Sequence, residues 1–353
     1  MKIRLIIGPP GSGKSTEIKN FVLNNEKSIV IGFSWMLCSL IGGKTFYNVF
    51  GIHPNMNVLD DTKKILISRL NIHYLLVDEV FMFNSNEFNM LIECAKCLPD
   101  LKEIICYGDF MQLKSYDGLF YEKIGLDKIE IEYRTKIYRS IGCPRLTNLI
   151  ESYRNTGKLD LSIFKDKIIT SENTLIKDYV LSGGIICCGT NERIRFWTSK
   201  LYNFKGFQKL PDNRLYLGKA YMDESYDILV KGLIVNIERF DKTKVWITLP
   251  GNREALCIPG KWQKYNWHFP FSPLIATTVH KLQGQTLDKI IIDISDLFEF
   301  NSVYTAISRV KKIEDIIIFC PKDKLSILDR PIETSVMIWK TFRENKDNTA
   351  DNQ

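Results

Sequence analysis

The stretch Gly8-Pro9-Pro10-Gly11-Ser12-Gly13-Lys14-Ser15 decides the fold of this chain. It follows the apolar run 2–7, has the form G-x-x-x-x-G-K-S, and is followed by Thr16. In such a loop the backbone N–H groups surround the phosphates of a nucleotide, the Lys binds the β and γ phosphates, and the hydroxyl binds Mg²⁺. We therefore predict that residues 8–16 bind a nucleotide, that Lys14 is also catalytic, and that Ser15 is a Mg²⁺ ligand.

Polar residues follow two further apolar runs in the first half of the chain. The run 74–77 ends in Asp78-Glu79, and the run 103–107 is followed by Gly-Asp-Phe-Met-Gln112. Asp78 is predicted to hold Mg²⁺, and Glu79 to be the base that activates the attacking water, because carboxylates serve both roles in P-loop enzymes. Gln112 is a predicted catalytic residue, since its amide can bridge the γ-phosphate or its water without adding charge.

Apolar runs alternate with helical patterns along most of the chain, which is typical of βαβ units and parallel sheets. A new apolar run at 184–188 predicts a second lobe with a parallel sheet. Short alternating strands with Gly and Pro in the turns then predict a small β-rich insertion. The predicted domains are a first lobe at 1–135, a second lobe at 136–206 and 272–342, the insertion within it at 207–271, and a flexible tail at 343–353.

The composition fits an ordinary globular protein. The 353 residues are 45% hydrophobic and 25% charged, with a formal net charge of +7 that suits a polyanionic partner without requiring one. The nine Cys follow no disulfide framework, and no second pair completes a zinc site with Cys94 and Cys97, so we predict no structural metal. The sequence has no N-terminal signal and no apolar stretch near the length of about 20 residues that spans a membrane. We expect a soluble intracellular protein of the cytoplasm or nucleus, in a host cell if the chain is viral.

Further motifs match a known family. They are Ala-Thr-Thr-Val-His-Lys-Leu-Gln-Gly-Gln-Thr-Leu at 276–287, Val-Tyr-Thr-Ala-Ile-Ser-Arg-Val at 303–310, Thr190-Asn191, Tyr138-Arg139, and the stretch 41–52. Together with the three nucleotide motifs they resemble the superfamily 1 helicases, most closely the Pif-type and RecD-like branch with its viral and mobile-element members. The resemblance spans Gly8 to Phe319. It implies an α/β fold of two RecA-like P-loop NTPase lobes with parallel sheets.

The resemblance also implies an activity. We expect an ATP- and Mg²⁺-dependent helicase or translocase that moves 5′ to 3′ on single-stranded DNA, with RNA as the alternative strand and replication or processing proteins as partners. Arg139 and Arg309 would reach the γ-phosphate, and Gln283 would couple the nucleic acid to the nucleotide. Tyr133-Arg134 is a rival for the position of Tyr138-Arg139. The implied nucleic-acid contacts are Lys44, Thr45, Phe46, Tyr47, Thr190, Asn191, Thr278, His280, Lys281 and Gly284.

Two features of the first lobe bear on contact with the strand and on strand separation. Tyr47 stands where the family usually has a His, and the short segment 53–61 is the only obvious room for a strand-separating wedge in the first lobe. Candidates for stacking on bases are Phe46, Tyr47, Trp262 and Trp267, with packing of the insertion or of the first lobe's core as the alternative. Translocation is therefore a stronger expectation than strong unwinding.

Two other function classes remain open at this point. A reduced helicase core could be a nucleic-acid-binding ATPase switch or assembly factor that does not unwind duplexes. A small-molecule kinase would share the phosphate loop, but it would leave Gln283 and Arg309 unexplained.

Overall fold

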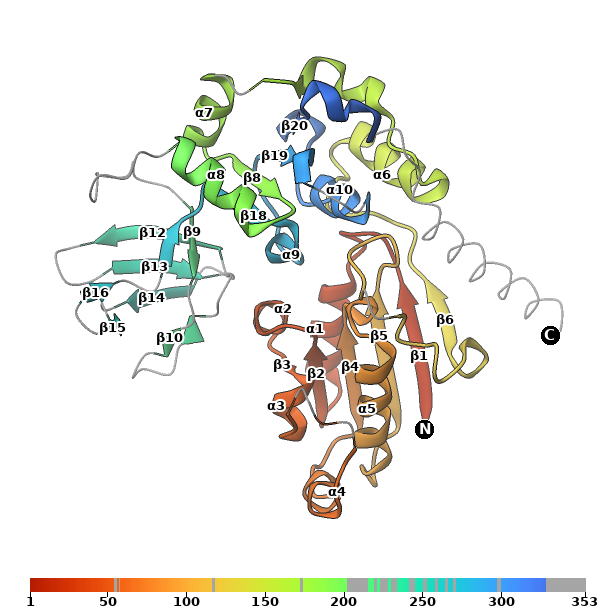
Figure 1. Cartoon of the computed structure of the whole chain (residues 1–353). Coiled ribbons are helices and arrows are strands. Elements are labelled where there is room, and N and C mark those ends of the chain that lie inside the picture. The colour runs from red at the N-terminus through yellow and green to blue at the C-terminus, as the bar shows by residue number, and fades with distance from the viewer. Residues whose placement is uncertain are drawn as a thin grey trace. The chain divides into compact units, whose positions relative to one another are not determined.

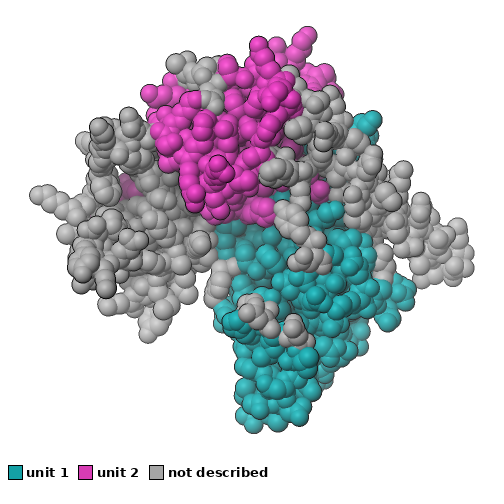
Figure 2. All heavy atoms as spheres, viewed as in Figure 1, with its two compact units in different colours: residues 1–159, 330–353 teal, residues 160–329 magenta. Residues whose placement is uncertain are grey.

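The computed structural model describes residues 1–53, 56, 58–115, 118–171, 174–201, 271–296 and 300–327, and within 215–268 only the strands. These residues form two compact units, which we call unit 1 (residues 1–159) and unit 2 (residues 160–327). Figure 2 shows them in separate colours. The division falls after Leu159, and not after residue 135 as expected, so the segment with Arg139 groups with unit 1. The expected tail at 343–353 lies outside the described residues.

Unit 1 is built on a six-stranded sheet in which every pair of neighbouring strands is parallel. The apolar strands carry buried side chains on both faces, as expected for a sheet covered by helices on each side. Because the strands are parallel, their carboxyl ends lie along one edge of the sheet. The strand order is β3 (Lys44–Thr45), β2 (Ser28–Gly32), β4 (Tyr74–Asp78), β5 (Glu103–Gly108), β1 (Lys2–Ile7) and β6 (Glu130–Tyr133).

Helices cover the two faces of this sheet (Figure 1). Helix α1 (Lys14–Asn24) contributes Ile18 to a core that also contains Ile6 of β1 and Leu76 of β4. Helix α5 (Ser85–Lys96) begins with a capping box of Asn84 and Glu87, which satisfies N–H groups that would otherwise lack partners at its start. The other α-helices among the described residues of the unit are α2 (Trp35–Leu40), α3 (Phe46–Phe50), α4 (Asp61–Ser68) and α6 (Pro144–Thr156).

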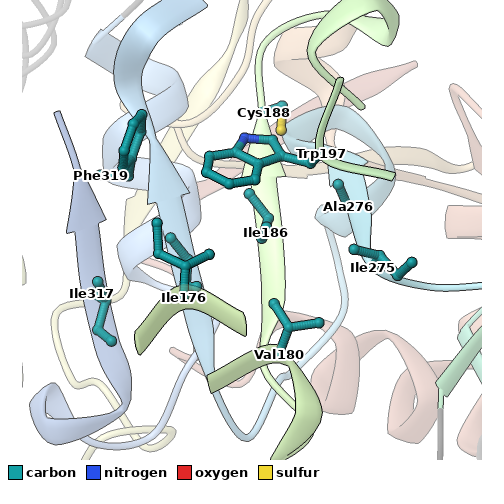
Figure 3. Close-up of a cluster of buried hydrophobic side chains, with 10 residues drawn as sticks. Ile176, Val180, Ile186, Cys188, Trp197, Ile275, Ala276, Ile317 and Phe319 are labelled. Atoms are coloured by element: carbon teal, nitrogen blue, oxygen red, sulfur yellow. The ribbon is translucent and has the colours of Figure 1, made fainter. Parts of the chain in front are cut away.

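Unit 2 contains a second parallel sheet, of five strands. Helices α7 (Thr174–Leu181) and α8 (Asn191–Leu201) pack on it around the buried indole of Trp197, which lies near Cys188 and Phe319 (Figure 3). Trp197 makes an edge contact with Phe319 at 5.2 Å between ring centroids. The predicted fold of two parallel-sheet lobes is confirmed. The strand order is β18 (Ala276–Thr278), β8 (Ile185–Cys188), β19 (Ile290–Asp293), β20 (Ile316–Phe319) and β7 (Ile168–Ile169).

Antiparallel strands between α8 and β18 form the β-rich insertion expected at 207–271. The side chains of Trp262 and Trp267 lie outside the described part of the chain, so their predicted stacking stays a prediction. The five-stranded sheet has the order β14 (Arg253–Cys257), β13 (Val245–Leu249), β12 (Ile234–Phe240), β9 (Leu215–Gly218) and β17 (Phe271–Pro273). Two strand pairs accompany it, β10 (Tyr221–Met222) with β11 (Ile228–Leu229), and β15 (Gly260–Gln263) with β16 (Asn266–His268).

The buried carboxylate of Asp293 in β19 binds two side chains of α8 and so joins this helix to the sheet of unit 2. Asp293 accepts hydrogen bonds from Nε of Arg193 and Nε1 of Trp197, both at 2.5 Å, and from the Ser295 N–H at 2.9 Å. We expect Asp293→Asn to lower the free energy of unfolding by about 3 kcal/mol, because it leaves the Arg193 cation without its partner. Urea denaturation measures the loss, and the exposed Asp288→Asn is the matched control. Equal midpoints for the two variants would contradict this role.

Candidate nucleotide and nucleic-acid sites

The phosphate loop of unit 1 has the backbone that its sequence predicts. Gly11 and Gly13 have φ angles of 77° and 90°, in the left-handed region that favours glycine. A Cβ at Gly11 would lie 2.4 Å from Cβ of Arg139, so a side chain cannot be accommodated there. No side chain caps the start of α1, which leaves its first N–H groups for an anion.

Lys14 lies inside this loop. Its Nζ donates hydrogen bonds to the carbonyl oxygens of Gly8 at 2.7 Å and Pro9 at 3.0 Å. Burial lowers the pKa of the ammonium, and the carboxylates of Asp109, Glu79 and Asp78 oppose this shift. The ammonium is therefore surrounded by loop carbonyls and negative charge, while Ser15 and Thr16 are exposed at the start of α1.

The two acidic residues after β4 differ in environment. Asp78 is buried at the strand end, and burial followed by the charge of Glu79 raises the pKa of its carboxyl to about 7, against the effect of Lys14. Glu79 is half-buried and has φ 50° and ψ 47°, a left-handed conformation that costs a residue with a side chain about 1 to 3 kcal/mol. Such strain is common at functional sites, and the sequence alone did not indicate it.

The raised pKa of Asp78 predicts a pH-dependent stability for the protein without Mg²⁺ and nucleotide. Between the ordinary value of 3.8 and about 7, the folded protein binds more protons than the unfolded chain, so stability falls as pH rises through this window. Asp78→Asn cannot ionise and lacks this loss. We expect the melting temperature of Asp78→Asn minus that of the unchanged protein to increase from pH 5 to pH 8. A difference in melting temperature that stays constant from pH 5 to pH 8 would contradict the raised pKa of Asp78.

The third motif continues the same edge of the sheet. The carbonyl of Gly108 at the end of β5 accepts a hydrogen bond from the Gly8 N–H at 3.1 Å, which joins this strand end to the phosphate loop. The N–H of Gln112 donates to the carbonyl of Asp109 at 3.0 Å, and the Gln112 side chain is buried. Gln112 therefore stands on a tight turn beside the loop, and its catalytic role stays a prediction.

Arg134 and Arg139, the two candidates for the arginine that reaches the γ-phosphate, lie in different environments. The guanidinium of Arg134 donates to Glu17 of α1 at 3.1 Å and to Glu132 at 2.5 Å, and it is therefore engaged in ion pairs. Arg139 lies over Gly11, and the N–H of Tyr138 donates to the Gly11 carbonyl at 2.8 Å. This placement favours Tyr138-Arg139 as the motif that serves the phosphates.

The residues fit a nucleotide with Mg²⁺. Lys14 and the N–H groups of the loop suit phosphates, and the Ser15 hydroxyl and Asp78 carboxylate are oxygen ligands of the kind that Mg²⁺ prefers. Among the described residues, no group of three or more His, Cys, Asp or Glu could hold a metal ion. Mg²⁺ sites with few protein ligands are usual where phosphates and water complete the shell.

The predicted nucleic-acid contacts in unit 1 need one correction. Phe46 is only 1% exposed and packs against Tyr47 and Phe83, with ring centroids 4.0 and 5.9 Å away, so it is a core residue and not a stacking surface. The Tyr47 hydroxyl donates to Glu87 at 3.1 Å, and burial raises the pKa of this phenol. In the two-residue strand β3, Lys44 is exposed and Thr45 is buried.

In unit 2 the Thr190 hydroxyl is committed within the fold. The hydroxyl donates to Asp296, and its oxygen accepts from the Arg193 N–H at 3.2 Å, so Thr190 fixes the start of α8. Its predicted contact with nucleic acid stays a prediction. Asn191 is exposed next to it. The start of helix α9 (Val279–Leu282) is different, because Thr278 makes no side-chain cap there and His280 is exposed.

The stretch after α9 is joined to the segment that carries Arg309. The Leu287 N–H donates to the Arg309 carbonyl at 2.9 Å. The Arg309 guanidinium donates through Nε to the Thr305 carbonyl at 2.9 Å and through Nη2 to Ser308 Oγ at 2.7 Å, within helix α10 (Phe300–Ile307) and the turn after it. Arg309 is buried in this arrangement.

Three residues with predicted roles, Lys281, Gln283 and Gly284, lie at the end of α9 and in the turn after it. Gln283 is fully buried, and within the described part of the chain neither of its amide atoms has a hydrogen-bond partner. Gly284 is exposed with a φ of 74°, and Lys281 is half-buried with its carbonyl bonded to Gln285 at 2.6 Å. A buried amide without partners is costly, which is consistent with the prediction that Gln283 couples the nucleic acid to the nucleotide.

Comparison with known families decides the identity. The model of the viral superfamily 1 RNA helicase core domain matches residues 5–183, just over half of the chain. The chain belongs to the superfamily 1 helicases. The matched segment of this helicase contains the phosphate loop, Asp78-Glu79, Gln112 and Arg139.

Individual proteins extend the likeness over nearly the whole helicase. The ATP-dependent DNA helicase Pif1 of Campylobacter jejuni is 22% identical over 404 residues, covering 89% of this chain and 88% of the relative. The crystal structure of Bacteroides Pif1 bound to ssDNA has a TM-score of 0.71 at 18% identity and covers 98% of this chain and 94% of that chain. The Pif1 helicase of Candida albicans has a TM-score of 0.70 at 16% identity and covers 98% and 96%. The predicted Pif-type fold is confirmed.

No helix among the described residues of this helicase combines the length and apolar character needed to cross a membrane.

Sequence reasoning missed one residue near the nucleotide site. Arg154 of α6 forms a buried ion pair with Asp109 beside the phosphate loop. No sequence motif pointed to Arg154, because the pair joins positions 45 residues apart.

Proposed function

We propose that this helicase couples ATP hydrolysis to 5′ to 3′ translocation on single-stranded DNA and to unwinding of duplexes. The observation that carries the proposal is the arrangement in unit 1, where Lys14, Asp78-Glu79 and Gln112 follow strands at one edge of one parallel sheet. The relatives support the same chemistry, since the Campylobacter protein is named an ATP-dependent DNA helicase and a Bacteroides Pif1 structure holds ADP-AlF3 with ssDNA.

The residues of unit 1 have different roles in ATP hydrolysis. The loop N–H groups and Lys14 bind the phosphates, which requires Lys14 to exchange its bonds to the Gly8 and Pro9 carbonyls for phosphate oxygens. Glu79 accepts a proton from the attacking water, and Gln112 orients that water. Mg²⁺, held by Ser15 and Asp78, would neutralise charge on the phosphates.

The residues of unit 2 are suited to link the strand to the nucleotide. Lys281 and the exposed His280 and Gly284 offer contacts to a phosphate backbone, which gives little sequence preference. The hydrogen bond from Leu287 to the Arg309 carbonyl joins this region directly to the arginine. We propose that Arg309 and Arg139 stabilise charge on the γ-phosphate, so that occupancy of the strand site changes the rate of hydrolysis.

DNA is the favoured strand because the named relatives are DNA helicases, while the matched family model is described as an RNA helicase core. The proposed setting is the compartment where this nucleic acid is copied or processed, in the cytoplasm or nucleus, with replication proteins as partners. Contacts to the phosphate backbone alone distinguish DNA from RNA poorly, since recognition of the 2′-OH depends on local geometry.

A strand-displacement assay separates this proposal from an ATPase switch. We expect the protein to release the labelled strand of a duplex with a 5′ single-stranded tail when ATP and Mg²⁺ are present, and to leave a duplex with a 3′ tail intact. Lys14→Ala serves as the inactive control. Hydrolysis stimulated by single strands without displacement on either substrate would support the switch or assembly factor instead.

A further inference from the structure

Asp109 is a buried carboxylate beside the phosphate-binding ammonium. It follows Gly108, whose carbonyl accepts a hydrogen bond from the Gly8 N–H at 3.1 Å. The carbonyl of the same Gly8 accepts from Lys14 Nζ at 2.7 Å. A negative charge at this depth is screened little by solvent. Left unbalanced, the Asp109 carboxylate would attract Lys14 and repel an incoming phosphate.

Arg154 balances this charge. Its Nη1 donates to Oδ1 of Asp109, and the side chains of the pair are 8% and 0% exposed. The guanidinium carbon lies 4.5 Å from the ring centroid of Phe110, and the Met111 N–H donates to the same carboxylate oxygen at 3.2 Å. The guanidinium is thus fixed by an ion pair and by a ring face, in a site shaped for Arg and not for Lys.

Stability alone is a weak reason for such a pair. Removing two charges from water costs several kcal/mol each, and apolar residues of similar volume often stabilise a protein equally well. The position of the pair suggests a different reason. Asp109 directly follows Gly108, which is bonded to Gly8 of the phosphate loop, and Gly8 in turn accepts the hydrogen bond from Lys14, so the charges of the pair lie next to the residues that bind phosphate.

We propose that Arg154 is a positioning residue of the nucleotide site, which neutralises Asp109 and thereby keeps the Lys14 ammonium available for phosphate. The inference rests on the proposed function, since it takes a nucleoside phosphate as the ligand of the loop. Asp109 is also the first residue of the turn that carries Gln112, since its carbonyl accepts the Gln112 N–H at 3.0 Å. Arg154 lies near the end of α6, shortly before the chain enters unit 2.

Binding of a fluorescent ADP derivative to the full chain tests this proposal through the sign of the charge. Arg154→Gln leaves Asp109 unbalanced and should weaken binding roughly tenfold or more. Asp109→Asn should not weaken binding, because it leaves a positive charge near the phosphates. The double variant Arg154→Gln with Asp109→Asn should return to within about threefold of the unchanged protein.

Binding is measured at a temperature where circular dichroism shows each variant to be folded. Arg193→Gln is the matched control, because it breaks a similar pair with the buried Asp293 in unit 2 and should leave ADP affinity unchanged. If Arg154→Gln alone does not fold, the double variant still tests the proposal, since it should bind ADP within about threefold of the unchanged protein and weaker binding would overturn the role of charge balance. Equal affinity in Arg154→Gln, or no recovery in the double variant, would overturn the proposal.

Failure of the inference and failure of the proposed function give different results. If the unchanged protein hydrolyses ATP without any response to single strands, the proposed function is wrong, and the ADP measurements still decide the role of Arg154. If hydrolysis responds to single strands and Arg154→Gln binds ADP normally, only the role of Arg154 is wrong.

Discussion

Replacing Glu79 with Gln is expected to lower the rate of ATP hydrolysis about 10³-fold while the protein still binds ATP. A general base contributes roughly 10² to 10⁴ to such rates, and the amide of Gln cannot accept the proton of the attacking water. Glu79 directly follows β4 and the buried Asp78, and its strained backbone holds the carboxylate at this edge of the sheet. Single-turnover hydrolysis with saturating single strands measures the effect on chemistry apart from product release.

Glu93→Gln is a matched control for this prediction. Glu93 lies in α5 of the same unit, and its exposed carboxylate pairs with Lys96 at 2.7 Å. Its loss should leave turnover unchanged, because exposed ion pairs contribute little. A Glu79→Gln protein that hydrolyses ATP within about threefold of the unchanged rate would assign the base to another residue.

Replacing Arg309 with Ala is expected to lower turnover by roughly 10³-fold or more and to change nucleotide affinity by less than about threefold. The reason is that an arginine finger stabilises charge that develops on the transferring phosphoryl group, whereas the ground-state phosphates are bound by the loop of unit 1. In the structure the guanidinium is bonded to the Thr305 carbonyl and to Ser308, so it must exchange these bonds when it acts on phosphate. Steady-state turnover and equilibrium binding of a fluorescent nucleotide give the two numbers.

Arg195→Ala is the comparison for this variant, since Arg195 is an exposed arginine on α8 of unit 2. It should retain full turnover. Thermal melts of both variants are needed, because Arg309 is buried and its removal also breaks bonds inside unit 2. Unchanged turnover in a folded Arg309→Ala protein would reassign the arginine to a structural role in α10.

The sequence was most informative where local pattern determines local structure. The phosphate loop requires glycine at left-handed positions, and Gly11 and Gly13 have these φ angles. Asp78 and Gln112 could be placed at one edge because they follow apolar runs, and the carboxyl ends of parallel strands meet there. Family motifs then linked these residues to Arg139 of unit 1 and to Arg309 of unit 2.

The sequence was least informative where the environment of a side chain depends on tertiary packing. Phe46 stands beside the exposed Lys44 in a stretch that resembles a nucleic-acid contact, yet it packs against Phe83 in the core. The hydrogen bond of the Thr190 hydroxyl could not be predicted either, because its partner Asp296 is 106 residues away. The pair of Arg154 and Asp109 could not be found from spacing, since helix α6 shows only an ordinary amphipathic pattern.

The extent of unit 1 also depended on packing. Alternation of apolar runs with helical patterns led us to expect the end of the first lobe near residue 135, and the structure adds strand β6 just before this point. The Arg134 N–H donates to the Ile7 carbonyl at 2.7 Å, and the Tyr138 N–H donates to the Gly11 carbonyl, so the chain stays on the phosphate loop beyond β6. Helix α6 then joins the same unit through the contact of Arg154 with Asp109.

The most direct test of the central claim is the rate of ATP hydrolysis by the unchanged protein, measured without nucleic acid and with DNA or RNA homopolymers in parallel. The proposed coupling of Arg309 and the α9 region to hydrolysis predicts a low basal rate that rises strongly with single-stranded DNA and less with RNA. A high rate without nucleic acid that neither homopolymer changes would contradict a nucleic-acid motor.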